Sequence, residues 1–131
     1  MAGYSGTPLP KKLGIKPQFR VSLDGMPAEV KTELQDALAG CAISRDQLDF
    51  AMLFVKSRAE LKKQFAATAA KLEPAGILWA SWPKKSSGVA TDLTEDEVRK
   101  IGLEAGLVDV KVCAVNEVWS GLKFVRRVKD R

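Results

Sequence analysis

Apolar and polar residues follow one another in short blocks that predict alternating strands and helices. Phe19–Leu23 alternates apolar and polar side chains and then meets Asp24-Gly25, which predicts a strand that ends in a turn. A helical pattern follows between Pro27 and Gly40, and its apolar face consists of Val30, Leu34 and Leu38. The residues Cys41–Gln47 are expected to form a connection.

Two continuous apolar runs, Leu48–Val55 and Ile77–Trp82, predict strands that are covered on both faces. Between them, Ser57 and Glu60 have the spacing of a capping box, which predicts the start of a helix. The apolar stripe of that helix consists of Leu61, Phe65, Ala69 and Leu72. The segment Pro74–Gly76 is expected to end it.

The last third of the chain predicts one more helix and a hairpin. Thr94 and Glu97 form a second capping box, and the helix is expected to close at Gly106. Leu107–Val115 is the segment that alternates best and predicts a strand, and Leu122–Val125 is expected to return as its antiparallel partner. One face of the first strand is expected to carry Val108, Val110, Val112 and Ala114, with Cys113 on the other.

This order of elements predicts an α/β fold. Right-handed crossovers between buried strands favour a three-layer Rossmann-like sandwich with a mostly parallel five-stranded sheet and a C-terminal antiparallel hairpin. At 131 residues, one domain is expected, with residues 1–17 as a polar lead-in.

Composition excludes several kinds of chemistry. The chain has no histidine, which excludes Ser-His-Asp and Cys-His catalysis and His-ligated metal sites, and we expect neither a metal nor a cofactor. Cys41 and Cys113 are expected to be reduced, buried thiols. Neither a secretory signal nor a membrane-spanning run is visible, so the expected location is the cytoplasm.

The segments at the two ends resemble those of the class I methyltransferases, the Rossmann-like group that binds S-adenosylmethionine. Leu13–Gly25 is similar to the entry to the first strand, and Thr94–Gly106 with Val108–Val125 is similar to the last helix and the closing hairpin. The resemblance implies a shortened form of that fold. Leu23–Pro27 stands where the family has its Gly-x-Gly-x-Gly loop. The gap before Leu48 has room for only one helix, so the family's second and third strands and their acidic residue are not expected.

The chain also resembles a bacterial family known only as a domain of unknown function. The matching blocks are Tyr4–Leu9, Trp82–Leu93, Val108–Ala114 and Trp119–Phe124. That resemblance implies a small cytoplasmic bacterial protein and supplies no activity.

A basic, hydroxyl-rich loop after the Ile77–Trp82 strand is the predicted binding site. Its residues are Lys84, Lys85, Ser86, Ser87 and Gly88. Ligands of open α/β sheets bind at the carboxyl ends of strands, so we also assign Asp24, Thr91 and Asp92 to this rim. The alternative is a solvated connection, and turn chemistry also explains both aspartates.

Two of the three tryptophans, Trp79 and Trp82, are expected to have structural roles, and Trp119 is the exception. Trp79 and Trp82 are three residues apart, so they are expected on opposite faces of their strand. Trp119 sits near the hairpin turn, where it is either an interface anchor or a lid over the apolar face of the hairpin; we favour the interface.

These features predict a non-catalytic module that binds a small anion or phosphate, or has a regulatory role. One alternative is a degenerate methyltransferase-like enzyme that uses S-adenosylmethionine or a nucleotide. Another is an interaction subunit, such as a homodimer, that docks through Trp119 and the basic C-terminus. A nucleic-acid partner is not expected, because the chain has none of the usual recognition motifs.

Overall fold

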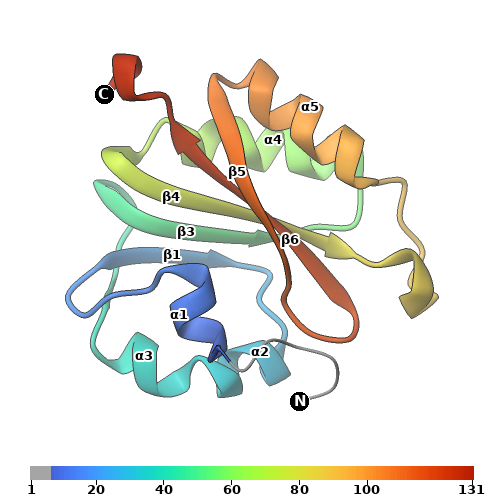
Figure 1. Ribbon diagram of the computed structural model, residues 1–131, viewed down its shortest axis with the longest axis horizontal. Coiled ribbons are helices and arrows are strands. Elements are labelled where there is room, and N and C mark those ends of the chain that lie inside the picture. Colours follow the sequence, from blue (N-terminus) through green and yellow to red (C-terminus); the bar gives the residue numbers. More distant parts are fainter. Residues whose placement is uncertain (1–6) are drawn as a thin grey trace.

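Six strands form the single sheet of this protein, seen in a computed structural model that describes residues 7–131 (Figure 1). They are β1 (Arg20–Asp24), β2 (Ala42–Ile43), β3 (Leu48–Phe54), β4 (Leu72–Pro83), β5 (Leu107–Ala114) and β6 (Trp119–Arg126). The strand order is β2-β1-β3-β4-β6-β5. The four strands β2, β1, β3 and β4 pair in parallel, and β6 runs antiparallel to both β4 and β5.

Helices cover both faces of the sheet. They are α1 (Leu9–Leu13), α2 (Ala28–Glu33), α3 (Gln35–Ala39), α4 (Arg58–Ala69) and α5 (Glu95–Glu104), with 3-10 turns η1 (Lys85–Ser87) and η2 (Val128–Asp130). Residues 1–6, which include part of the predicted lead-in, lie outside the described residues. From Leu9 onward the lead-in belongs to the packed domain, because Leu9 and Leu13 are buried. Within residues 7–131, no helix is both long and apolar enough to cross a lipid bilayer.

The predicted α/β sandwich with an antiparallel C-terminal hairpin is confirmed, but the sheet has six strands instead of five. The additional strand, β2, lies in the segment expected to be a connection and pairs only with Arg20 and Val21. The chain then turns back, and Ser44 and Asp46 both contact the Arg20 guanidinium. A strand of two residues has no periodicity from which it could be predicted.

Two predicted boundaries are also corrected. The expected single helix after Pro27 is two helices, because Leu34 leaves the helical conformation (φ −94°, ψ 0°) while its side chain stays buried. Strand β4 begins at Leu72 and contains Pro74 and Gly76, which were expected to end the preceding helix. The β3–β4 register shifts beside them, and a Cβ on Gly76 would lie 2.7 Å from the Leu48 carbonyl oxygen. This irregular pairing accommodates the proline.

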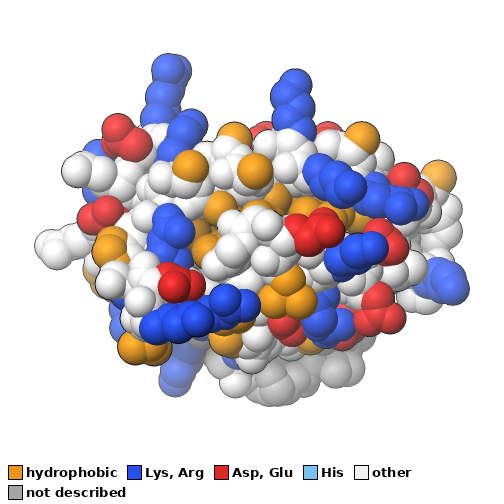
Figure 2. Space-filling model, turned by 90° about the horizontal axis from the view of Figure 1, so that it is seen from above, with side chains coloured by type: hydrophobic (Ala, Val, Ile, Leu, Met, Phe, Trp, Pro, Cys, Tyr) orange, Lys and Arg blue, Asp and Glu red, His pale blue; other side chains and the backbone are white. Residues whose placement is uncertain are grey.

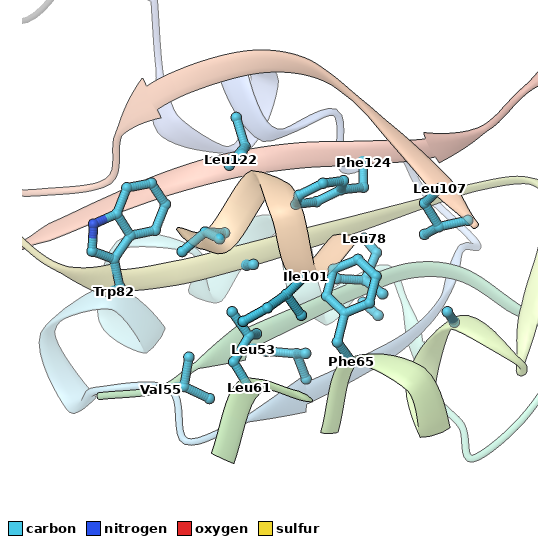
Figure 3. Packing of buried hydrophobic residues seen from close by; sticks show 14 of the residues in the cluster. Leu53, Val55, Leu61, Phe65, Leu78, Trp82, Ile101, Leu107, Leu122 and Phe124 are labelled. Atoms are coloured by element: carbon cyan, nitrogen blue, oxygen red, sulfur yellow. The ribbon is translucent and has the colours of Figure 1, made fainter. Parts of the chain in front are cut away.

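Each face of the sheet has its own core. Helices α4 and α5 pack on one face, where Phe65, Ile101, Leu78 and Phe124 converge (Figure 3). Helices α1 and α2 pack on the other face, together with Phe50, Met52 and Trp79. The expectation that the two tryptophans point to opposite faces is confirmed, because Trp79 belongs to the α1 side and Trp82 to the α5 side.

A bulge at Val110 divides β5 into two parts. The alternation of side chains between the two faces of the sheet is reversed from one part to the other. Asp109 pairs with Phe124 and the next register pair is Lys111 with Lys123, so Val110 is the additional residue. The predicted common face of Val108 and Val112 is therefore wrong. Val108 pairs with Val125 on the α1 side, whereas Val112 pairs with Leu122 on the α5 side. Val110 and Val112 are both exposed.

Candidate functional site

The carboxyl ends of the parallel strands form one rim of the sheet, at Asp24, Phe54 and Pro83. After β1 the chain enters α2 on one face, and after β3 it enters α4 on the opposite face. Strands β1 and β3 are neighbours, so the crossover direction changes between them. In open α/β sheets, ligands bind in the crevice at such a switch point.

A pocket of about 550 Å³ lies at this place, and we refer to it as the switch-point pocket. It is lined by Gly25, Pro27, Glu29, Phe54, Lys56, Glu60, Val89, Val118 and Trp119. Phe54 and Trp119 meet edge to face, with ring centroids 5.1 Å apart, and form its apolar wall. Glu29, Lys56 and Glu60 supply charges of both signs. The Lys56 backbone N–H donates to Glu60 Oε1 over 3.0 Å, which holds the Glu60 carboxylate beside the end of β3.

Gly25 shapes the floor of the switch-point pocket. Its φ of +70° is in the left-handed region, and a Cβ at this position would lie 2.8 Å from the Phe54 carbonyl oxygen. Only glycine satisfies both conditions. The glycine therefore lets the β1–α2 turn pack closely against the end of β3.

The predicted basic loop lies beside this pocket. Its first residue, Lys84, donates its backbone N–H to the Val118 carbonyl over 2.7 Å, which joins the loop to the turn of the β5–β6 hairpin. A second pocket of about 430 Å³, which we call the loop pocket, borders it. Its lining residues are Trp82, Pro83, Lys84, Lys85, Thr91, Asp92, Leu93, Thr94, Glu95 and Ser120.

Three of the predicted site residues hold the protein's own backbone. Ser87 Oγ donates to the Lys84 carbonyl over 2.6 Å, and Thr91 Oγ1 donates to the Lys56 carbonyl over 2.6 Å. Asp92 Oδ1 accepts from the Arg58 N–H over 2.7 Å, at the first residue of α4. Gly88 has a φ of +77°, which explains a glycine there by turn geometry. These contacts fasten the loop onto the β3–α4 connection.

The structure therefore brings together only part of the predicted site. Lys84, Lys85, Thr91 and Asp92 line the loop pocket, whereas Asp24 lies at the end of β1 and lines neither pocket. Ser86 is exposed on η1. Sequence reasoning did not identify Glu29, Lys56 and Glu60 as pocket residues. The signal available was their position directly after two strands, but the switch point becomes visible only when the strand order is known.

Trp119 is the predicted interface residue, and the structure places it in the core. Its side chain is 7% exposed and packs on Phe54. An interface anchor needs an exposed ring, so this placement agrees with the other alternative, a lid over the apolar face of the hairpin. An interface through the basic C-terminus stays a prediction.

Cys113 is also buried, and burial raises the pKa of its thiol even though the nearby ammonium groups of Lys12, Lys111 and Lys84 oppose that shift. A raised thiol pKa disfavours the thiolate that a nucleophile requires.

No protein-family model matches this chain, and no curated protein matches it significantly. Solved structures do share its fold. The magnesium protoporphyrin IX methyltransferase of Synechocystis PCC 6803 with bound SAM has a TM-score of 0.60 and 15% identity, covering 91% of this chain and 74% of that chain. A SAM-dependent methyltransferase of Aquifex aeolicus has a TM-score of 0.61 and 14% identity, covering 87% and 85%. The ribosomal protein L11 methylase of Lactobacillus delbrueckii subsp. bulgaricus has a TM-score of 0.55 and 12% identity, covering 91% and 75%.

This chain has a methyltransferase-like Rossmann fold. At 12–15% identity, these neighbours show the fold of this chain. The resemblance to a bacterial family of unknown function has no matching family model and stays a prediction.

Proposed function

We propose that this chain is a methyltransferase-like protein that binds S-adenosylmethionine in the switch-point pocket. The observation that carries the proposal is the position of that pocket, at the carboxyl ends of β1 and β3 in a fold shared with SAM-binding methyltransferases. When bound, S-adenosylmethionine supplies a methyl group for transfer to an acceptor.

The pocket fits the amino-acid end of this cofactor. An α-amino acid carries one ammonium and one carboxylate, and the pocket offers Lys56 to the carboxylate and Glu29 and Glu60 to the ammonium. The Phe54–Trp119 pair offers an apolar wall to the methionine side chain. A volume of about 550 Å³ is within the range of small-molecule sites.

In class I methyltransferases an acidic residue of the second strand usually holds the ribose of the cofactor. The ribose end would be held differently in this chain. Strand β2 pairs only with the beginning of β1, so its carboxyl end does not reach the rim at Asp24. The acidic side chain that follows it, Asp46, pairs with Arg20 instead. Since neither this acidic contact nor the full glycine-rich loop is available, we expect weaker binding than in methyltransferases that have both.

Isothermal titration calorimetry with S-adenosylmethionine and S-adenosylhomocysteine tests this proposal. Lys56→Met and Glu29→Gln should each weaken binding by about 10-fold or more, since a hydrogen bond to a charged group contributes about 1.5–3 kcal/mol. Glu33→Gln is the matched control, because Glu33 is an exposed residue of the same helix, α2, and lies outside the pocket. Absence of binding at millimolar concentrations would end the proposal, as would equal weakening in the control.

The anion-binding module is the second candidate, because Lys84 and Lys85 both line the loop pocket. Asp92 and Glu95 line the same pocket and would repel an anion, and the Ser87 hydroxyl already donates to the Lys84 carbonyl. If this function is the right one, inorganic phosphate should raise the melting temperature, and Lys84→Ala with Lys85→Ala should abolish the increase. S-adenosylmethionine binding should be unchanged in that variant.

A further inference from the structure

Lys111 on β5 and Lys123 on β6 are directly opposite each other in the sheet. Both side chains are on the α1 side, since Lys111 Nζ donates to the Lys12 carbonyl over 3.2 Å and a Cβ on Gly14 would lie 3.9 Å from Lys123 Nζ. Like charges directly opposite on neighbouring strands destabilise a sheet. The fold therefore retains a like-charge pair at this position of the sheet.

The bulge at Val110 creates this pair. If β5 paired regularly through Val110, Val110 would lie opposite Lys123, and Lys111 would lie on the same face as Asp109, which bonds to Arg99 on the α5 side over 2.9 Å. The bulge moves Lys111 to the α1 side while Asp109 stays on the α5 side. Bulges commonly redirect a side chain in this way near functional sites.

Two further lysines extend the positive charge over the end of α1. Lys12 Nζ donates to the Ala114 carbonyl over 3.5 Å, which places it at the far end of β5. Lys16 follows α1 and acts on Lys123: burial lowers the pKa of Lys123, and the ammonium groups of Lys111 and Lys16 lower it further. Among the residues that the structure describes, no carboxylate contributes to the pKa shift of Lys123.

The charge on this surface is not balanced as it is elsewhere. On the α5 side, Arg99 pairs with Glu95, Asp96 and Asp109, and Figure 2, which views the molecule from the side of α4 and α5, shows acidic and basic side chains interspersed. Among residues 7–131, no ion pair involves Lys16, Lys111 or Lys123.

We propose that this lysine surface, formed by Lys12, Lys16, Lys111 and Lys123, binds the phosphate backbone of a nucleic acid. Ammonium groups gathered on the edge strand β5, its neighbour β6 and the end of α1 suit an extended polyanion, whose phosphates would relieve the repulsion between the lysines. Backbone recognition requires no base-reading motif, so the absence of such motifs from the sequence does not oppose it. The proposal does not depend on the switch-point pocket.

Fluorescence anisotropy with labelled 20-nucleotide single-stranded and duplex oligonucleotides tests the proposal at salt concentrations between about 50 and 200 mM. The site variant is Lys16→Gln, Lys111→Gln and Lys123→Gln; Lys12 is kept because it bonds to the backbone of β5. The matched control is Lys62→Gln, Lys63→Gln and Lys100→Gln, which removes the same charge from exposed positions on α4 and α5. The site variant should bind at least about 10-fold more weakly, with a salt slope lower by about 2 to 3, because each phosphate contact contributes about 0.9. The control should bind like the wild type.

Three results would overturn the proposal: no binding by the wild type at about 50 mM salt, equal weakening in both variants, or tighter binding to inorganic triphosphate or to phosphatidylserine vesicles than to the oligonucleotides. Thermal unfolding gives an independent readout. Lys123→Gln alone removes the Lys111–Lys123 repulsion and keeps the bond from Lys111 to the Lys12 carbonyl, so this variant should melt at the same temperature as the wild type or higher. A lower melting temperature would contradict the argument.

Discussion

Gly102 of α5 lies directly against the ring of Phe124 on β6. A Cβ added to Gly102 would lie 2.0 Å from Phe124 Cε2 and 2.5 Å from Cζ, far inside contact distance. The same ring meets Phe65 of α4 edge to face, with centroids 4.9 Å apart. Phe124 is thus the point at which the sheet and both helices of this face meet, and Gly102 allows α5 to approach it.

Gly102→Ala should therefore destabilise the protein, although alanine is the better helix former by about 1 kcal/mol. Overpacking a buried site costs about 1–3 kcal/mol, and the Phe124 ring is fully buried and packs on Phe65. Urea unfolding monitored by circular dichroism measures the change. Adding Phe124→Leu should recover part of the loss, because it removes the ring atoms that clash. A Gly102→Ala variant as stable as the wild type would contradict this packing.

Trp79→Phe should cost more than Trp82→Phe, although both remove an indole from the same strand. Trp79 Nε1 donates to the Leu13 carbonyl over 2.8 Å in a fully buried contact that joins β4 to the end of α1. Its loss leaves a buried carbonyl oxygen without this donor, at about 1–3 kcal/mol. Comparing the two variants by thermal unfolding separates the hydrogen bond from the change in volume. Equal melting temperatures would show that the bond contributes nothing.

Asp92→Ala should destabilise the start of α4. The Asp92 carboxylate accepts from the Arg58 N–H, beside the N-cap Ser57, and loss of a helix-capping contact costs about 0.5–2 kcal/mol. Asp92→Asn keeps an oxygen acceptor and should retain most of the stability. Hydrogen exchange of the first turn of α4 should accelerate in the alanine variant only. Unchanged exchange there would contradict a capping role for Asp92.

Stability above pH 9 should depend on Cys113. Burial raises the folded-state pKa of this thiol above its ordinary value of 9.0. As the pH rises past 9.0, the thiol ionises first in the unfolded chain, so the free energy of unfolding falls until the pH passes the folded-state pKa. Cys113→Val removes this loss, and the variant should gain stability relative to the wild type as the pH rises past 9.0. Urea titrations across this rise in pH measure the difference, and parallel curves would contradict it. Cys41 is present in both the wild type and the variant, so its titration does not contribute to the difference in stability between them.

Local chemistry made much of the fold predictable. The Ser57 and Thr94 hydroxyls each accept from the backbone N–H three residues later, as the two capping boxes predict. The continuous apolar run that ends at Phe54 correctly predicted a strand buried on both faces.

Features that depend on partners distant in the sequence could not be predicted. The strand β2 exists only because β1 is beside it, and the bulge at Val110 is visible only against the register of β6. Features of the candidate site that depend on distant partners could not be predicted either. The sequence favours an interface role for Trp119 over a lid because its contact with Phe54 cannot be seen there, and the bond from the Arg58 N–H to Asp92 is equally invisible.

The order of the strands has a consequence for synthesis. Strand β6 follows β5 in the chain but lies between β4 and β5 in the sheet. While the ribosome is still making the segment Trp119–Arg126, the long edge of β4 from Leu78 to Pro83 has no partner on that side. An open apolar edge of this kind can pair with other chains. Nascent or truncated chains that lack β6 should therefore be the aggregating species, and they are the ones that a chaperone would need to protect.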